Sequence, residues 1–312
     1  MPIVGTFGNA SARLYGILAS RRRGLGGPIT VTYLVVAGGG GSEAPDIGSS
    51  GGGGAGGFLT GTFTTSGGAR LDIKVGAGGT GSSQGQASNI TSTEGVFSGS
   101  TIEAIGGGAG SKALFPATTG NDGYPGGSGG GGGSRLTNQR AGGSGTPGQG
   151  FNGGAGKAYN FSEWEGGGGG GGAGGAGADA QGVFDPDPRG IRGGNGGSNL
   201  SSAITGSIVY YAGGGGGSGG DTTPGAVNEN GVGSAPGTSG RSGNGGLYGG
   251  GAGGTRQGAA VNRSGGAGVV ILRSNARASN TIGSPTEIQV SSDWVYRFTG
   301  SGSIILGIPL PE

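Results

Sequence analysis

Short apolar segments, rich in β-branched residues, alternate with glycine tracts along this chain. The segment ARLDIKV at 69–75 alternates apolar and charged side chains, which predicts a strand with one dry and one solvated face. The segment ITVTYLVVA at 29–37 predicts a second strand, and SGG at 66–68 predicts a hairpin turn between strands 58–64 and 69–75. Further strands are predicted at 58–64, 101–105, 207–212, 268–274, 287–291, 294–299 and 303–306. These segments gather near the two ends of the chain, so we expect the ends to meet in one sheet or sandwich.

The longest glycine tract, GGGGGGGAGGAGA at 166–178, predicts a different kind of structure. Glycine loses more conformational freedom on folding than any other residue, so such a run is unfavourable in a helix or a strand. After the run, Ala173, Ala176 and Asp179 recur at every third position, which is the period of a polyproline-II-type helix. In a packed bundle of such helices, only glycine lets neighbouring backbones approach closely. The tracts therefore predict a bundle of polyglycine-II helices.

Composition supports this unusual architecture and excludes several functions. The 312 residues include 93 glycines and 13 prolines, yet the glycine triplets are interrupted too often for collagen. The net charge is +2 and the only run of basic residues is Arg21 to Arg23, so no nucleic-acid partner is predicted. Histidine and cysteine are absent, which removes the commonest general base, thiolate nucleophiles and disulfides. We expect no enzyme activity, no cofactor, no metal and no membrane insertion.

The predicted fold is mainly β, with short antiparallel strands, a polyglycine-II bundle and little or no α-helix. We divide the chain into an N-terminal docking arm at 1–26, a glycine-rich domain at 27–274, and a C-terminal strand hairpin at 275–312 that completes the sheet. In the arm, residues 9–22 place Leu14, Ile17 and Leu18 on one helical face. Gly16 interrupts that pattern, and an extended arm that docks on another subunit is the favoured interpretation.

Three motifs resemble chemical sites, and each has a simpler explanation. Glycines 52, 54 and 57 match a dinucleotide-binding pattern, but no helical pattern follows them. The segment DPDP at 185–188 offers carboxylates for a hard cation, but its prolines favour a rigid turn. Glu163 and Glu165 flank Trp164 and could form an acid/base pair, but a solvated loop is favoured.

Loops between the glycine tracts carry large side chains amid small polar residues, a composition typical of recognition surfaces. These loops lie at 111–125, 157–165 and 182–192. An equally weighted alternative is that their aromatic residues cap the bundle or pack on a neighbouring chain. The candidate receptor-binding residues are Phe115, Tyr124, Tyr159, Phe161, Trp164 and Phe184.

An ordered series of motifs resembles the glycine-rich domain of bacteriophage tail-fibre and related virion proteins. The motifs are YLVVAGGGGS (33–42), GGGGAGG (51–57), DIKVGAGGTG (72–81), IEAIGGGAG (102–110), YYAGGGGGSGG (210–220) and SGGAGVVILRS (264–274). In related fibre-tip adhesins, polyglycine-II helices form a layered bundle whose tip loops contact the bacterial surface. The phrase YRFTGSGSI at 296–304 also resembles these proteins, although there it often precedes the domain.

The resemblance implies a virion structural protein, a tail fibre or fibre-tip adhesin, made in the host cytoplasm and located on the tail or capsid surface. Its implied partners are other virion proteins and a host receptor, either an outer-membrane protein or a polysaccharide, and a homotrimer is left open. The candidate virion-docking residues of the arm are Leu14, Tyr15, Arg21, Arg22 and Arg23. Two alternatives are a capsid decoration or head-fibre protein and a glycine-rich ice-binding protein.

Overall fold

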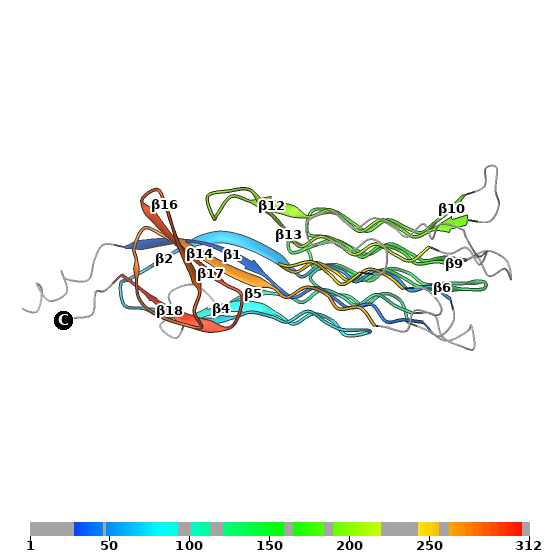
Figure 1. The fold of residues 1–312 in the computed structure, drawn as a ribbon, viewed down its shortest axis with the longest axis horizontal. Coiled ribbons are helices and arrows are strands. Elements are labelled where there is room, and N and C mark those ends of the chain that lie inside the picture. Colours follow the sequence, from blue (N-terminus) through cyan, green and yellow to red (C-terminus); the bar gives the residue numbers. More distant parts are fainter. Residues whose placement is uncertain are drawn as a thin grey trace, which may run out of the picture.

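The computed structural model describes residues 28–45, 48–92, 101–112, 121–158, 165–183, 190–219, 243–255 and 262–307. Figure 1 shows an elongated molecule with a layer of strands at one end and a bundle of glycine tracts at the other. We call these the sheet end and the far end. The described residues form antiparallel strands and no helix, which confirms the mainly-β prediction. The arm at 1–26, with its proposed helix or docking segment, lies outside the described residues.

Two five-stranded antiparallel sheets pack face to face at the sheet end. The first has the order β16-β17-β14-β1-β2, formed by Thr286–Val290, Asp293–Phe298, Val269–Ser274, Ile29–Val36 and Phe58–Thr65. The second has the order β15-β18-β3-β4-β5, formed by Ala278–Ile282, Gly302–Leu306, Arg70–Lys74, Ser88–Ser92 and Thr101–Ala104. Residues after position 275 therefore contribute two strands to each sheet. The two ends of the domain meet where β1 pairs with β14.

Four short antiparallel pairs connect the glycine tracts. They are β6 with β7 (Ser134–Arg135, Asn138–Gln139), β8 with β9 (Lys157–Ala158, Glu165–Gly166), β10 with β11 (Gln181–Val183, Gly190–Arg192) and β12 with β13 (Leu200–Ser202, Val209–Tyr211). All the strand segments predicted from the sequence are present, with ends shifted by one or two residues. The short strands β6 to β12 were not predicted, and neither were β4 and β15, each of which has a single isoleucine among mostly polar residues.

The apolar core lies between the two sheets. Val31, Leu272, Phe298 and Ile304 are almost fully buried there. A second apolar cluster covers the other face of the first sheet, where Leu34, Val36 and Ile271 pack with Tyr211 of the β12–β13 hairpin. This arrangement explains the sequence of β1, in which ITVT alternates while LVV is continuously apolar, because only the second half is buried on both faces.

The predicted hairpin turn at residues 66–68 is wrong. Strands β2 and β3 belong to different sheets and do not pair with each other. The turn instead carries the chain from one sheet to the other, with Gly68 at a positive φ of 89°. Both strands bury one apolar face, and crossing between the sheets directs these two faces toward the same core.

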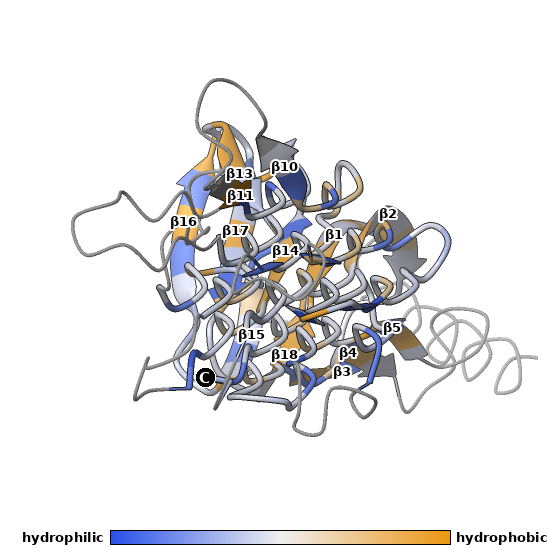
Figure 2. Cartoon of the chain, turned by 90° about the vertical axis from the view of Figure 1, so that its right-hand side faces the viewer, coloured by the Kyte–Doolittle hydropathy of each residue, from blue (hydrophilic) through white to orange (hydrophobic). Residues whose placement is uncertain are grey.

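The glycine tracts pack as helices with a three-residue period. In tract 51–57, amides 51, 54 and 57 donate to tract 105–111, amides 52 and 55 to tract 168–171, and amides 53 and 56 to tract 249–252. Its carbonyls accept from three other tracts, at 37–40, 128–131 and around 215. A helix with three residues per turn directs its donors and its acceptors in three directions each, so this tract is enclosed by six neighbours. Figure 2 shows the tracts from the far end as coils running side by side.

The seven-glycine run is also enclosed by six neighbouring tracts. Amides 167 and 170 donate to the tract at 215–218, and the remaining amides and carbonyls join tracts near residues 53, 131, 153, 177 and 195. The chain then bends at Ala173, and the following segment runs along the surface with Ala176 and Asp179 exposed. Of the three-residue series read from the sequence, Ala176 and Asp179 thus face solvent, whereas Ala173 is buried and Gly177 faces inward onto Gly169.

Candidate functional site: the far end of the bundle

A layer of buried hydroxyl groups closes the bundle at its far end. These side chains lie where glycine tracts end, and each is almost inaccessible to solvent. They are Ser42, Ser49, Ser50, Ser111, Ser134, Ser218 and Thr255. A polyglycine helix leaves unpaired backbone groups where its neighbours stop, and a hydroxyl can both donate to and accept from such groups.

Ser50 is the most highly bonded member of this layer. Its hydroxyl donates to the Thr255 carbonyl at 2.9 Å and accepts from the Thr255 amide at 2.8 Å. Its own carbonyl accepts from the Ser218 hydroxyl at 2.9 Å. Ser134 similarly donates to the carbonyl of Gly166 at 2.9 Å and contacts the Ser49 hydroxyl at 3.0 Å. The layer therefore fixes the positions at which the chain leaves the bundle.

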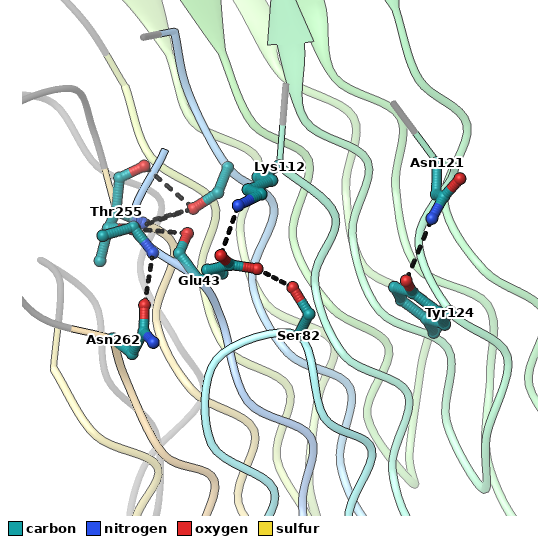
Figure 3. Close-up of polar contacts among 9 residues, drawn as sticks. Glu43, Ser82, Lys112, Asn121, Tyr124, Thr255 and Asn262 are labelled. Carbon is teal, nitrogen blue, oxygen red and sulfur yellow. Dashed lines mark hydrogen bonds and ion pairs between the residues drawn. The ribbon is translucent and has the colours of Figure 1, made fainter. Parts of the chain in front are cut away.

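A charged cluster lies beside this layer. The carboxylate of Glu43 accepts hydrogen bonds from Lys112 and from Ser82, as Figure 3 shows. Nearby, the Thr255 hydroxyl donates to the Glu43 carbonyl at 3.0 Å, and the Asn262 side chain accepts from the Ala44 amide at 3.1 Å. The cluster ties together four chain segments that are distant in sequence.

The pKa of Glu43 lies below its ordinary value of 4.5. Burial alone would raise this pKa, but the hydrogen bonds from Lys112 and Ser82 and the charge of Lys112 together outweigh burial. The unfolded chain therefore binds a proton at a higher pH than the folded chain does.

This depressed pKa predicts a pH-dependent effect of Glu43→Gln. The carboxylate stabilises the folded state above pH 4.5, and this contribution is lost as the pH falls through the folded-state pKa. We expect the unfolding free energy of the variant to lie below that of the wild type at pH 7 and to approach it in acid. Urea unfolding at several pH values between 7 and 3 measures this difference. A difference that stays constant over the whole range would contradict the prediction.

The expectation of a solvated loop around Glu163 and Glu165 is wrong for Glu165. This side chain is only 8% exposed, and its carboxylate accepts from the Leu136 amide at 2.7 Å. It lies in β9, where Ala158 is its register partner. Glu165 therefore holds the ends of neighbouring tracts together, whereas Glu163 and Trp164 lie outside the described residues.

Tyr124 is the one candidate receptor-binding residue that the structure describes. It is half-buried on the flank of the bundle, and its hydroxyl accepts from the Asn121 side chain at 3.1 Å, as Figure 3 shows. The two residues are three positions apart, so the helical period places them on one face. Tyr124 also bonds through its backbone to Ala109 and Gly130, which fixes it in the bundle.

The remaining candidates lie outside the described residues. They are Phe115, Tyr159, Phe161, Trp164 and Phe184 among the receptor-binding residues, and Leu14, Tyr15, Arg21, Arg22 and Arg23 among the docking residues; the DPDP motif lies outside as well. What the structure does place is the chain on either side of the three aromatic loops. Strand β9, paired with β8, and the β10–β11 pair lie at the far end, opposite the sheets (Figure 1), and Lys112 bonds Glu43 beside the hydroxyl layer.

Sequence reasoning missed the hydroxyl layer. A signal was present, because serine or threonine directly adjoins a glycine run in each case, as in GGGGS at 38–42 and SSGGGG at 49–54. In the described ranges, no group of three or more acidic, histidine or cysteine side chains could hold a metal ion. No described helix is long and apolar enough to cross a membrane.

Comparison with known families agrees with this architecture. The sequence profile of the family described as glycine-rich domain matches residues 26–275. The chain belongs to this family. The match to the glycine-rich domain begins just before β1 and ends just after β14, so it spans the whole bundle but excludes strands β15 to β18. No curated protein and no solved structure matches the chain.

Proposed function

We propose that this glycine-rich domain protein is a structural component of a bacteriophage virion, a tail fibre or fibre-tip adhesin that binds the host surface. The observation that carries the proposal is the polarity of the molecule. The sheets and the described residues nearest both termini lie at one end, whereas the chain on either side of the aromatic loops lies at the other. This polarity suits a protein that attaches at its sheet end and recognises a target at its far end.

The bundle gives this function a physical basis. Each enclosed tract is held by backbone hydrogen bonds to six neighbours, so the far end is a rigid platform without a large apolar core. The hydroxyl layer fixes where each loop leaves the platform. Loops between fixed ends can change in sequence and length without disturbing the tracts, because closing a longer loop costs little additional free energy. Such a surface can adapt to different receptors.

The test is binding of fluorescently labelled protein to intact cells from a panel of bacteria with different outer-membrane proteins and surface polysaccharides. We expect saturable labelling of a subset of the strains. A variant with residues 159–164 replaced by glycine and serine should lose this labelling and keep its unfolding transition. A control with the exposed sheet-end residues Thr281, Thr286 and Gln289 of β15 and β16 changed to serine should bind as the wild type does.

Two outcomes would contradict the adhesin proposal. If the protein labels no strain, or labels all strains equally, it does not recognise a surface receptor. A decoration or head-fibre role would then be favoured, and binding to purified capsids or tails would locate it. If only the sheet-end control loses binding, the receptor binds at the sheet end, which contradicts the proposal.

A further inference from the structure

Strand β2 lies at the edge of the first sheet. The Ala37 amide donates to the Gly57 carbonyl at 3.0 Å, so positions 57, 59, 61, 63 and 65 face β1. Bonding directions alternate along an antiparallel strand, so the backbone groups of Thr60, Thr62 and Thr64 face away from β1. In the described part of the chain, no strand pairs with this side of β2.

One of the backbone hydrogen bonds that an additional strand would make is already present at this edge. The Phe58 amide, which also faces away from β1, donates to the Gln149 carbonyl at 3.0 Å. The chain then turns away at Gly150 and Phe151. The edge can therefore accept an extended polypeptide, and among the described residues only its first position, Phe58, already has a backbone partner.

The edge continues into an apolar groove of about 610 Å³. Phe58, Leu59, Pro147, Phe151 and Leu200 line it, and none of its lining residues is charged. Phe151 is 48% and Leu200 39% exposed. A groove of this kind fits an uncharged segment with apolar side chains, because a charged group would lose its hydration there without gaining a partner.

The other sheet edges carry features that hinder strand addition. The outer strand β16 contains Glu287, which pairs with Arg277. The edge strand β15 has a register irregularity at Ala278 and Asn280. At β5, the Gln149 side chain bonds both the Glu103 carbonyl and the Ile105 amide. In contrast, β2 (FLTGTFTT) contains no charge and no proline, the usual protection of a free edge.

We propose that residues 3–7 at the start of the same chain pair with this edge of β2 and fill the groove. This segment, IVGTF, precedes the first charged residue, Arg13, and its VGTF differs from TGTF at 60–63 in one position. The following residues 8–27 give a flexible chain a root-mean-square span of roughly 25 Å. Strand β2 is about 27 Å long, at about 3.4 Å per residue. The connection to Pro28, beside the Thr65 end of β2, therefore holds the segment at high effective concentration near the groove.

The first test is amide hydrogen exchange measured by NMR on the full chain. We expect the amides of Thr60, Thr62 and Thr64 to exchange at least tenfold faster when Val4→Pro and Gly5→Pro remove two amide donors and prevent the segment from pairing, because the threonine amides then lose their acceptor carbonyls. The amides of Leu59 and Phe63, which face β1, serve as internal controls and should not change. Ser11→Pro, placed outside the segment, should have no effect. Equal exchange of the three threonine amides in all variants would overturn the proposal.

The second test uses the absence of cysteine from the chain, so that any disulfide must be an introduced one. Val4→Cys is combined in turn with Thr60→Cys, Thr62→Cys and Thr64→Cys, and oxidation is followed on a non-reducing gel. An intramolecular disulfide should form with at least one of these partners. It should not form with Thr281→Cys, on the exposed strand β15. Disulfides only between molecules would assign the groove to a second copy, and none at all would overturn the pairing; neither result depends on the proposed virion role.

Discussion

Gly170→Ala is expected to destabilise the folded chain by more than about 3 kcal/mol, beyond the usual range for an overpacked site. A Cβ at this position would lie 2.0 Å from the carbonyl oxygen of Gly53 and 2.4 Å from its carbonyl carbon. The clash is with backbone, so no side chain can rotate away. Tract 51–57 is itself enclosed by six neighbours, so any shift would propagate through the bundle. Urea unfolding followed by circular dichroism measures the loss.

Gly300→Ala is the matched control for this prediction. It makes the same chemical change at a site with no atom within 4 Å of the added Cβ and without a positive φ. We expect its unfolding free energy to stay within about 0.5 kcal/mol of the wild type, as for most surface substitutions. If the two variants unfold alike, the close approach of the tracts does not determine stability.

Leu272→Ala should cost about 3–5 kcal/mol of unfolding free energy, the range for a buried leucine that leaves a cavity. Leu272 is fully buried between the two sheets, and it lies on the central strand β14 between Tyr33 and Tyr296 as register partners. Neither neighbouring strand can move in without breaking its ladder, so the cavity should persist. Chemical denaturation with the intrinsic fluorescence of Trp294, which packs against this core, reports the change.

Leu247→Ala provides the comparison, because this leucine is 72% exposed. The same truncation there removes little buried area and should change the unfolding free energy by less than about 0.5 kcal/mol. A small effect at Leu272 would mean that the sandwich contributes little to the stability of the domain. The bundle would then have to fold independently of the sheets.

The strands could be predicted where side chains determine them. β-Branched residues in ITVTYLVV and the alternation in RLDIK are sufficient to indicate β1 and β3. Strand β4, with the sequence SNITS, lacks this signal, because serine usually favours turns. In the folded chain Ser88 is buried, and its hydroxyl accepts from the Gly76 amide at 2.8 Å. That bond joins residues twelve positions apart, so propensity alone could not reveal it.

The arrangement of elements in space was less predictable than the elements themselves. The turn at residues 66–68 has the composition of a hairpin, yet it joins two sheets, because a turn sequence does not specify which neighbour a strand will choose. The three-residue period predicted polyglycine helices correctly, but not which tracts lie together. Glycine has no side chain to encode a partner, so the order of the tracts is fixed by the strands and by the hydroxyl groups at their ends.

The six-neighbour packing of the tracts also determines how the stability of this protein should vary with temperature. Unfolding the bundle hydrates mainly peptide groups, which lowers the heat capacity, whereas unfolding the sandwich hydrates apolar side chains, which raises it. The two contributions oppose each other, so the increase in heat capacity per residue should be smaller than for a protein with a conventional core. A smaller increase gives a flatter curve of stability against temperature. The free energy of unfolding should therefore differ little between low and moderate temperatures.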